Sequence, residues 1–163
     1  MEARNERDHA CVAANDDQRV AAFSSQLRQA HQQLTDQLTR LRREFGRYEH
    51  VAAGLQVHCL AFCSALTAHH AGEDDGMFRD LLAARPDLAP TIRNLVDDHT
   101  AIAAILGRVR ALATQAETAP AESLPGLRRE LDGLAAIAES HFRYEERAIS
   151  AALDGPSALW PGH

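Results

Sequence analysis

Apolar residues recur with helical spacing in four successive segments, and this pattern limits the fold more than any other feature of the sequence. The segments cover residues 20–45, 55–77, 88–109 and 127–148, and each repeats apolar residues at the heptad positions of one helix face. Apolar residues make up 45% of the chain, with much Ala and Leu and 5% aromatic residues, which also favours helix. The sequence therefore predicts an all-α protein.

Three short breaks separate the segments. The first is bounded by Gly46 and Gly54, the second holds Pro86 and Pro90, and the third, residues 118–126, holds two further prolines. Short connections make neighbouring helices antiparallel, so we expect an up-down-up-down antiparallel four-helix bundle over residues 17–153.

The two ends of the chain differ from this single expected domain. Residues 1–16 are polar, and we expect them to be disordered or to form a short extra helix. The tail, residues 154–163, cannot continue the last helix because of its Gly and Pro residues, and we expect it to pack Trp160 on the surface. The 163 residues of the chain suffice for one domain with a substantial core.

Charge and hydropathy argue against several classes of partner. The net charge of −6 disfavours a nucleic-acid partner or an anionic membrane surface. The N-terminus has no apolar signal-peptide region, and no run of about 18 apolar residues predicts a membrane span. Cys59 and Cys63 are four residues apart on one helix face, which suits buried thiols better than a disulfide framework. We therefore expect a cytoplasmic protein.

Each apolar helix face contains one histidine: His31, His69, His99 and His141. In an antiparallel helix pair, two residues lie at the same height when they are equally far from the connecting turn. The midpoints between successive histidines fall inside the 46–54 break, next to Pro86, and within the third break. All three turns thus predict that the four imidazoles meet in one layer of the bundle core.

Two glutamates join this predicted layer. Glu73 follows His69 by four residues and Glu145 follows His141 by four, which is about 40° around a helix. Buried imidazoles without partners are costly, and a metal ion removes that cost by binding their lone pairs. Four histidines and two carboxylates exceed the needs of a tetrahedral zinc and suit two bridged ions, with iron favoured by the nitrogen and oxygen ligands. A purely structural cluster of charges is the alternative.

The residues that flank these candidates are expected to play lesser roles. His70 is expected on the surface or in a hydrogen bond to a ligand. Asp74 and Glu146 lie about 100° beyond the glutamates, so they should face outward or hydrogen-bond to ligands. Asp74 and Asp75 together are expected to form a solvated face.

His31, "HHAGED" at 69–74, "DDH" at 97–99 and "HFRYEE" at 141–146 together resemble the hemerythrin-like HHE cation-binding family. The resemblance covers residues about 17 to 153. It implies a non-haem centre of two iron ions, held in a four-helix bundle and joined by an oxo or hydroxo bridge and two carboxylates. The ligands that it implies are His31, His69, Glu73, His99, His141 and Glu145. His70 and Glu146 are reserve candidates, and Glu146 fits the H-x-x-x-x-D spacing of oxygen carriers.

The sequence departs from the oxygen-carrying members of the family at Leu95. Those proteins have H-x-x-x-H on the third helix, and Leu95 occupies the first of these positions. The iron pair should therefore be more open, unless His70, His58 or a tyrosine substitutes. His58 lies eleven residues before the ligand candidate of its helix, roughly 16 Å along the axis, so we expect it in the core or in a hydrogen bond to a ligand. Tyr48 and Tyr144 are expected to pack.

These observations lead to three hypotheses of function. The first is a di-iron protein that reacts with small oxidants, which are peroxide in a catalase-like cycle, nitric oxide or dioxygen. The second is a module without turnover that stores oxygen or senses iron or oxygen. The third is a structural bundle in which the metal only supports folding. A ferritin-like carboxylate bundle is weaker, since no glutamate of an apolar helix face precedes its histidine by three residues.

Overall fold

The computed structural model describes residues 24–43, 52–116, 118 and 120–153, and within these ranges every regular element is helical. The first helix covers residues 24–43. The others are α2 (Ala52–Gly72), the π-helix η1 (Glu73–Met77), α3 (Phe78–Ala84), the 3-10 helix η2 (Pro86–Leu88), α4 (Ala89–Gln115) and α5 (Pro120–Leu153). The all-α prediction is confirmed. The expectations for residues 1–16, Tyr48 and the tail with Trp160 lie outside the described residues.

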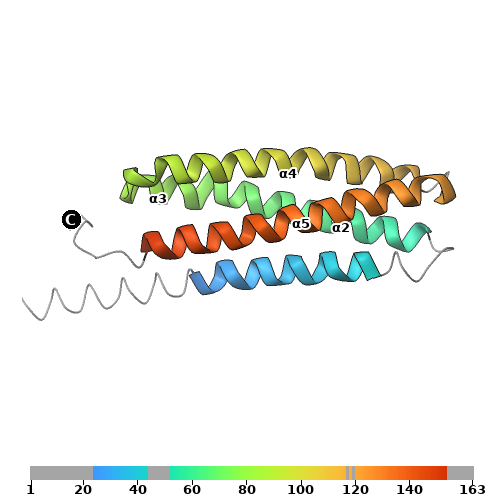
Figure 1. The fold of residues 1–163 in the computed structure, drawn as a ribbon, viewed down its shortest axis with the longest axis horizontal. Coiled ribbons are helices and arrows are strands. Elements are labelled where there is room, and N and C mark those ends of the chain that lie inside the picture. The colour runs from blue at the N-terminus through green and yellow to red at the C-terminus, as the bar shows by residue number, and fades with distance from the viewer. Residues whose placement is uncertain (1–23, 44–51, 117, 119, 154–163) are drawn as a thin grey trace, which may run out of the picture.

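The helices lie side by side along the longest axis of the molecule (Figure 1). Their colours run in alternating directions from one long helix to the next, which is compatible with the predicted up-down order. Helix α4 packs most extensively along α5, and it also lies against α2. Buried residues of the first helix, α2, α4 and α5 share one apolar cluster, so all four helices contribute to the core.

Two apolar clusters form the core. On the first helix, on α4 and on the rod of α2 and α3, the histidine layer lies between them in sequence, while on α5 His141 is followed directly by Phe142 of the larger cluster. The larger cluster contains residues of 34–41, 59–66, 102–113 and 127–142, including the fully buried Leu66 and Leu134. The smaller cluster is formed by Leu27, Phe78, Leu81, Ile92, Leu95 and Ile149. On the first helix, for example, His31 lies between Leu27 of one cluster and Leu34 of the other. The site is thus enclosed at both ends of the bundle by packed apolar side chains.

The π-helix η1 joins α2 to α3 without a break in the helical rod. A π turn holds about one residue more than an α turn, because its hydrogen bonds run from i to i+5. Phe78 is buried to 2% exposure, and Met77 is partly buried against the smaller apolar cluster, as expected for the edge of the core. A heptad count does not predict the extra residue of the π turn.

The predicted break before the last helix is too long. Helix α5 begins at Pro120 and includes Pro125, so the fourth helix starts well before the Leu127 that opened its apolar pattern. A proline at the first helical position is favourable, since its missing N–H would have no partner there. Pro125 is exposed and omits one hydrogen bond near the solvated start of the helix, where the freed carbonyl can bond to water.

Candidate metal centre

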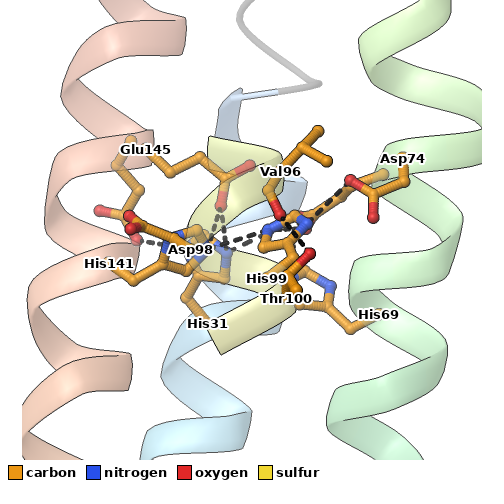
Figure 2. A network of polar contacts seen from close by, with 11 residues as sticks. His31, His69, Asp74, Val96, Asp98, His99, Thr100, His141 and Glu145 are labelled. Carbon is orange, nitrogen blue, oxygen red and sulfur yellow. Dashed lines mark hydrogen bonds and ion pairs between the residues drawn. The ribbon is translucent and has the colours of Figure 1, made fainter. Parts of the chain in front are cut away.

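The four predicted histidines converge in the middle of the bundle (Figure 2). His31, His99 and His141 are buried to 4% exposure or less. The ring centroids of His31 and His69 are 5.0 Å apart, and those of His99 and His141 are 4.7 Å apart. The Nε2 atoms of His99 and His141 approach to 3.0 Å. The one-layer prediction therefore agrees with where the structure places these rings.

Glu73 reaches into the same space and lies against histidines of three helices. Its Oε1 is 3.0 Å from Nε2 of His69 and 3.8 Å from Nε2 of His31, while its Oε2 is 3.6 Å from Nε2 of His99. Its two oxygens therefore face different histidines, as a carboxylate shared by two cations would require.

Glu145 approaches from the opposite helix, α5, and is fully buried. Its Oε2 lies 3.3 Å from Nε2 of His31 and 3.7 Å from Nε2 of His141. The structure places Glu145 in the cluster, whereas Glu146 stays 28% exposed at the edge. The H-x-x-x-E spacing thus describes the inward face of α5 better than the H-x-x-x-x-D spacing.

His70 is also part of the cluster, so the expectation that it lies on the surface is wrong. It is 6% exposed, and its ring stacks on His99 at a centroid distance of 4.0 Å. Helix geometry contains a signal for this position. Glu73 lies about 40° from His69 and about 60° from His70 in projection, so it falls between two adjacent histidines that both face inward.

Three overlapping groups of side chains could each hold a cation, with ligand atoms within 4.8 Å of one another. One group combines two histidines with a carboxylate, another combines three histidines, and the third contains both carboxylates and shares a residue with each of the others. They are His31/His69/Glu73, His70/His99/His141 and Glu73/His99/Glu145. Because the groups share Glu73 and His99, they form one continuous cluster of candidate cation ligands.

The polar atoms of this cluster fit bound metal ions. The Nε2 atoms of His31, His69 and His70 are buried without a hydrogen-bond partner, and so are both carboxylate oxygens of Glu73 and of Glu145. Several of these atoms lie within 4 Å of one another, but without the alignment of a hydrogen bond. Buried polar atoms are almost always satisfied in proteins. Cations supply the partners that these lone pairs lack.

Burial makes the charged forms of several of these groups costly. Burial, followed by the charge of His31, lowers the pKa of His69 to about 4. Burial, followed by the charge of neighbouring histidines, lowers the pKa of His70 to about 2. The pKa of Glu73 is raised to about 7 by burial, with His31 opposing this change. Neutral imidazoles are the form that binds metal ions.

His31 behaves differently because three carboxylates face it. Burial alone would lower its pKa, but the carboxylates of Glu145, Glu73 and Glu146 outweigh burial and raise its pKa to about 9. The metal-free cluster thus keeps a positive charge at His31, next to the carboxylates, where a cation would otherwise be held.

Carboxylates at the edge of the cluster hydrogen-bond to its histidines. Asp74 was expected in a solvated face, but it is 35% exposed and its Oδ1 accepts a hydrogen bond of 2.8 Å from Nδ1 of His99. Asp75 is 85% exposed, as expected, and lies near Arg79. The pattern identified Asp74 as a possible hydrogen-bonding partner but did not identify its histidine.

Two of the described residues considered as substitutes for the missing histidine lie outside the cluster. His58 is exposed and lines a surface pocket with Arg40 and Phe62, so the expectation that it lies in the core is wrong. Tyr144 packs against the smaller apolar cluster. Leu95 is fully buried in that cluster. Among these described candidates, only His70 reaches the site.

The model of one protein family, the hemerythrin HHE cation-binding domain, matches residues 22–153. The chain belongs to this family. No curated protein and no solved structure matches the chain. The hemerythrin HHE assignment confirms the resemblance stated from the sequence, and it identifies the chain as a cation-binding protein. In the described residues, no helix has the length and apolar character needed to cross a membrane.

Proposed function

We propose that this hemerythrin HHE protein is a non-haem di-iron protein that reacts with small oxidants. The single observation that carries this proposal is the set of seven buried, unsatisfied nitrogen and oxygen atoms that face one another in the histidine layer. The fold that we propose for it is the up-down-up-down antiparallel four-helix bundle. Two bound irons would supply redox chemistry toward peroxide, nitric oxide or dioxygen.

We assign the ligands to two positions that share both carboxylates. His31 and His69 would hold one ion, and His70, His99 and His141 the other. Glu73 and Glu145 would bridge them, since each lies against histidines assigned to both positions. Imidazole and carboxylate ligands without a thiolate suit iron. Cys59 and Cys63 are not joined in a disulfide and are buried in the larger apolar cluster, which also supports a reducing cytoplasm.

Aromatic and aliphatic side chains pack around the cluster and exclude water from it. Phe142 stacks on His31 at a centroid distance of 4.1 Å, and Phe78 stacks on His99 at 5.6 Å. Leu95 is fully buried one turn from His99. A site enclosed in this way favours reactants no larger than a few atoms. It also limits access of water to the carboxylates of Glu73 and Glu145.

Reversible oxygen binding without turnover is the second candidate, and the position of His70 favours it. Leu95 alone would leave an open place beside His99, which favours reaction with peroxide or nitric oxide. The structure puts the His70 ring against His99 instead. A third histidine for that position leaves fewer open places, as a carrier, store or sensor of oxygen requires.

Metal analysis with an optical spectrum tests the proposal, followed by titration of the iron-loaded chain with peroxide, nitric oxide and dioxygen. We expect close to two irons per chain, near-ultraviolet charge-transfer bands, and consumption of peroxide or nitric oxide. Repeated reversible oxygen binding by a chain inert to both other oxidants would establish the second candidate. One zinc per chain, with no iron uptake on reconstitution, would refute both.

A further inference from the structure

Three histidines of the cluster each donate a hydrogen bond from Nδ1 to a carboxylate on another helical segment. His99 donates to Asp74 of η1 over 2.8 Å, and His141 donates to Asp98 of α4 over 3.3 Å (Figure 2). The third pair joins His31 of the first helix to Glu146 of α5 over 2.9 Å. The three pairs therefore cross between segments, and together they connect every long helical rod of the bundle.

These hydrogen bonds determine which ring nitrogen is available to a metal. An ionised carboxylate can only accept, so Nδ1 of each histidine must carry the proton. In a neutral ring, Nε2 then holds the lone pair. That atom faces the centre in each case, lying 3.6 Å from Glu73 in His99, and 3.3 Å and 3.7 Å from Glu145 in His31 and His141.

The three histidine–carboxylate pairs are well placed to fix the orientation of the imidazole rings. The three imidazoles are almost fully buried, while the carboxylates are 28% to 50% exposed and keep one side in water. In metal sites, a carboxylate on the distant ring nitrogen orients the imidazole and makes it a better ligand.

We propose that Glu146, Asp74 and Asp98 are positioning residues that set the metal affinity of the cluster through His31, His99 and His141. The inference rests on the proposed function, because it needs the two ligand positions. It assigns Glu146 to the ion held by His31 and His69. Asp74 and Asp98 act on the other ion. The effect of each carboxylate should therefore be specific to one ion.

Conservative variants test this inference on the full chain. Asp74→Asn, Asp98→Asn and Glu146→Gln keep the shape and an acceptor oxygen but remove the charge. Asp97→Asn is the matched control, since Asp97 is the exposed neighbour of Asp98 on α4. Cobalt(II) is titrated into the metal-free chains, with the ligand-field absorption followed for each ion. We expect one of the two affinities to fall by about 10- to 100-fold in each test variant, with an altered ligand-field band, and no change in the control.

A structural role predicts a different result. If the carboxylates only hold helices together, the metal-free variants melt earlier while both cobalt affinities match the control, and that result overturns the inference. Far-ultraviolet circular dichroism checks folding, and a variant that does not fold leaves the other two to decide. A wild-type chain that binds fewer than two cobalt ions contradicts the proposed function itself. If the wild-type chain binds two cobalt ions and the variants keep both cobalt affinities, this inference is contradicted and the proposed function is not.

Discussion

The rings of His70 and His99 stack face to face, with 4.0 Å between centroids and 8° between planes. His70 is on α2 and His99 on α4, so the stack joins two helices at the level of the cluster. Burial, followed by the charge of His99, lowers the pKa of His70 to about 2, so the His70 ring of the stack is neutral. The stack therefore brings a second histidine of α2 to the site, beside the adjacent His69.

Removal of His70 should weaken one metal position. We expect His70→Ala to lower the affinity for one of two irons by at least tenfold, because the three-histidine group would lose a ligand. The measurement is iron content after dialysis at a series of free iron concentrations. His58→Ala is the control, since that exposed histidine of the same helix lies outside the cluster. Equal iron content in both variants would show that His70 is not a ligand.

The adjacent glutamates of α5 should differ sharply. Glu145→Ala removes a fully buried carboxylate that faces two histidines, so we expect the loss of at least one iron. Glu146→Ala should still hold two irons at saturating concentration, because its carboxylate contacts only the outer nitrogen of His31. Metal analysis of the two purified variants decides between them. If Glu146→Ala empties the site and Glu145→Ala does not, the assignment is wrong by one residue. Glu73→Ala should resemble Glu145→Ala.

Removal of the metal should lower stability without unfolding the chain. Both apolar clusters remain intact around the site, so the metal-free chain should keep its helices. Its melting temperature should fall, because ions that bind only the folded state stabilise it by mass action. Thermal melts followed by circular dichroism, with and without a chelator, measure this difference. Identical melting temperatures would show that binding and folding are not coupled.

Gly133 offers a stability test that is independent of the metal. It is exposed in the interior of α5, and an added Cβ would meet nothing within 4 Å. Gly133→Ala should therefore raise the free energy of unfolding by about 0.5–1 kcal/mol, because alanine loses less backbone entropy in a helix. Urea unfolding measures the change. At Gly126 an added Cβ would lie 3.5 Å from the Leu112 side chain, which is an ordinary van der Waals contact, so Gly126→Ala should also be tolerated.

Sequence periodicity predicted much of this molecule, for physical reasons that particular residues illustrate. Helical heptads specify which face of a helix is buried, and Leu34, Leu66 and Leu134 all lie in the core that the pattern indicated. Equal distances from the turns also placed His31 and His141 in one layer. Both arguments work because α-helices have a constant rise and pitch.

The same arguments failed where two adjacent residues of a helix face inward, where a contact joins two helices, and where a helix is not a regular α-helix. The pattern counted only His69 on its helix, although the wide inward face of α2 also includes His70. The partner of Asp74 depends on the packing of α4 against η1, which the sequence of one helix does not contain. The π turn is equally invisible to a heptad count. The antiparallel order, the domain limits and the ligand assignments remain predictions.

The π turn from Glu73 to Met77 gives one continuous helix two rotational settings. Up to its first residue, His69, His70 and Glu73 face the metal-ligand cluster, and after it Phe78 and Leu81 face the smaller apolar cluster. The extra residue is an insertion that is accommodated inside a helix rather than in a loop. A relative that runs through this region as a regular α-helix would therefore align with this chain only with a one-residue gap shortly after Glu73.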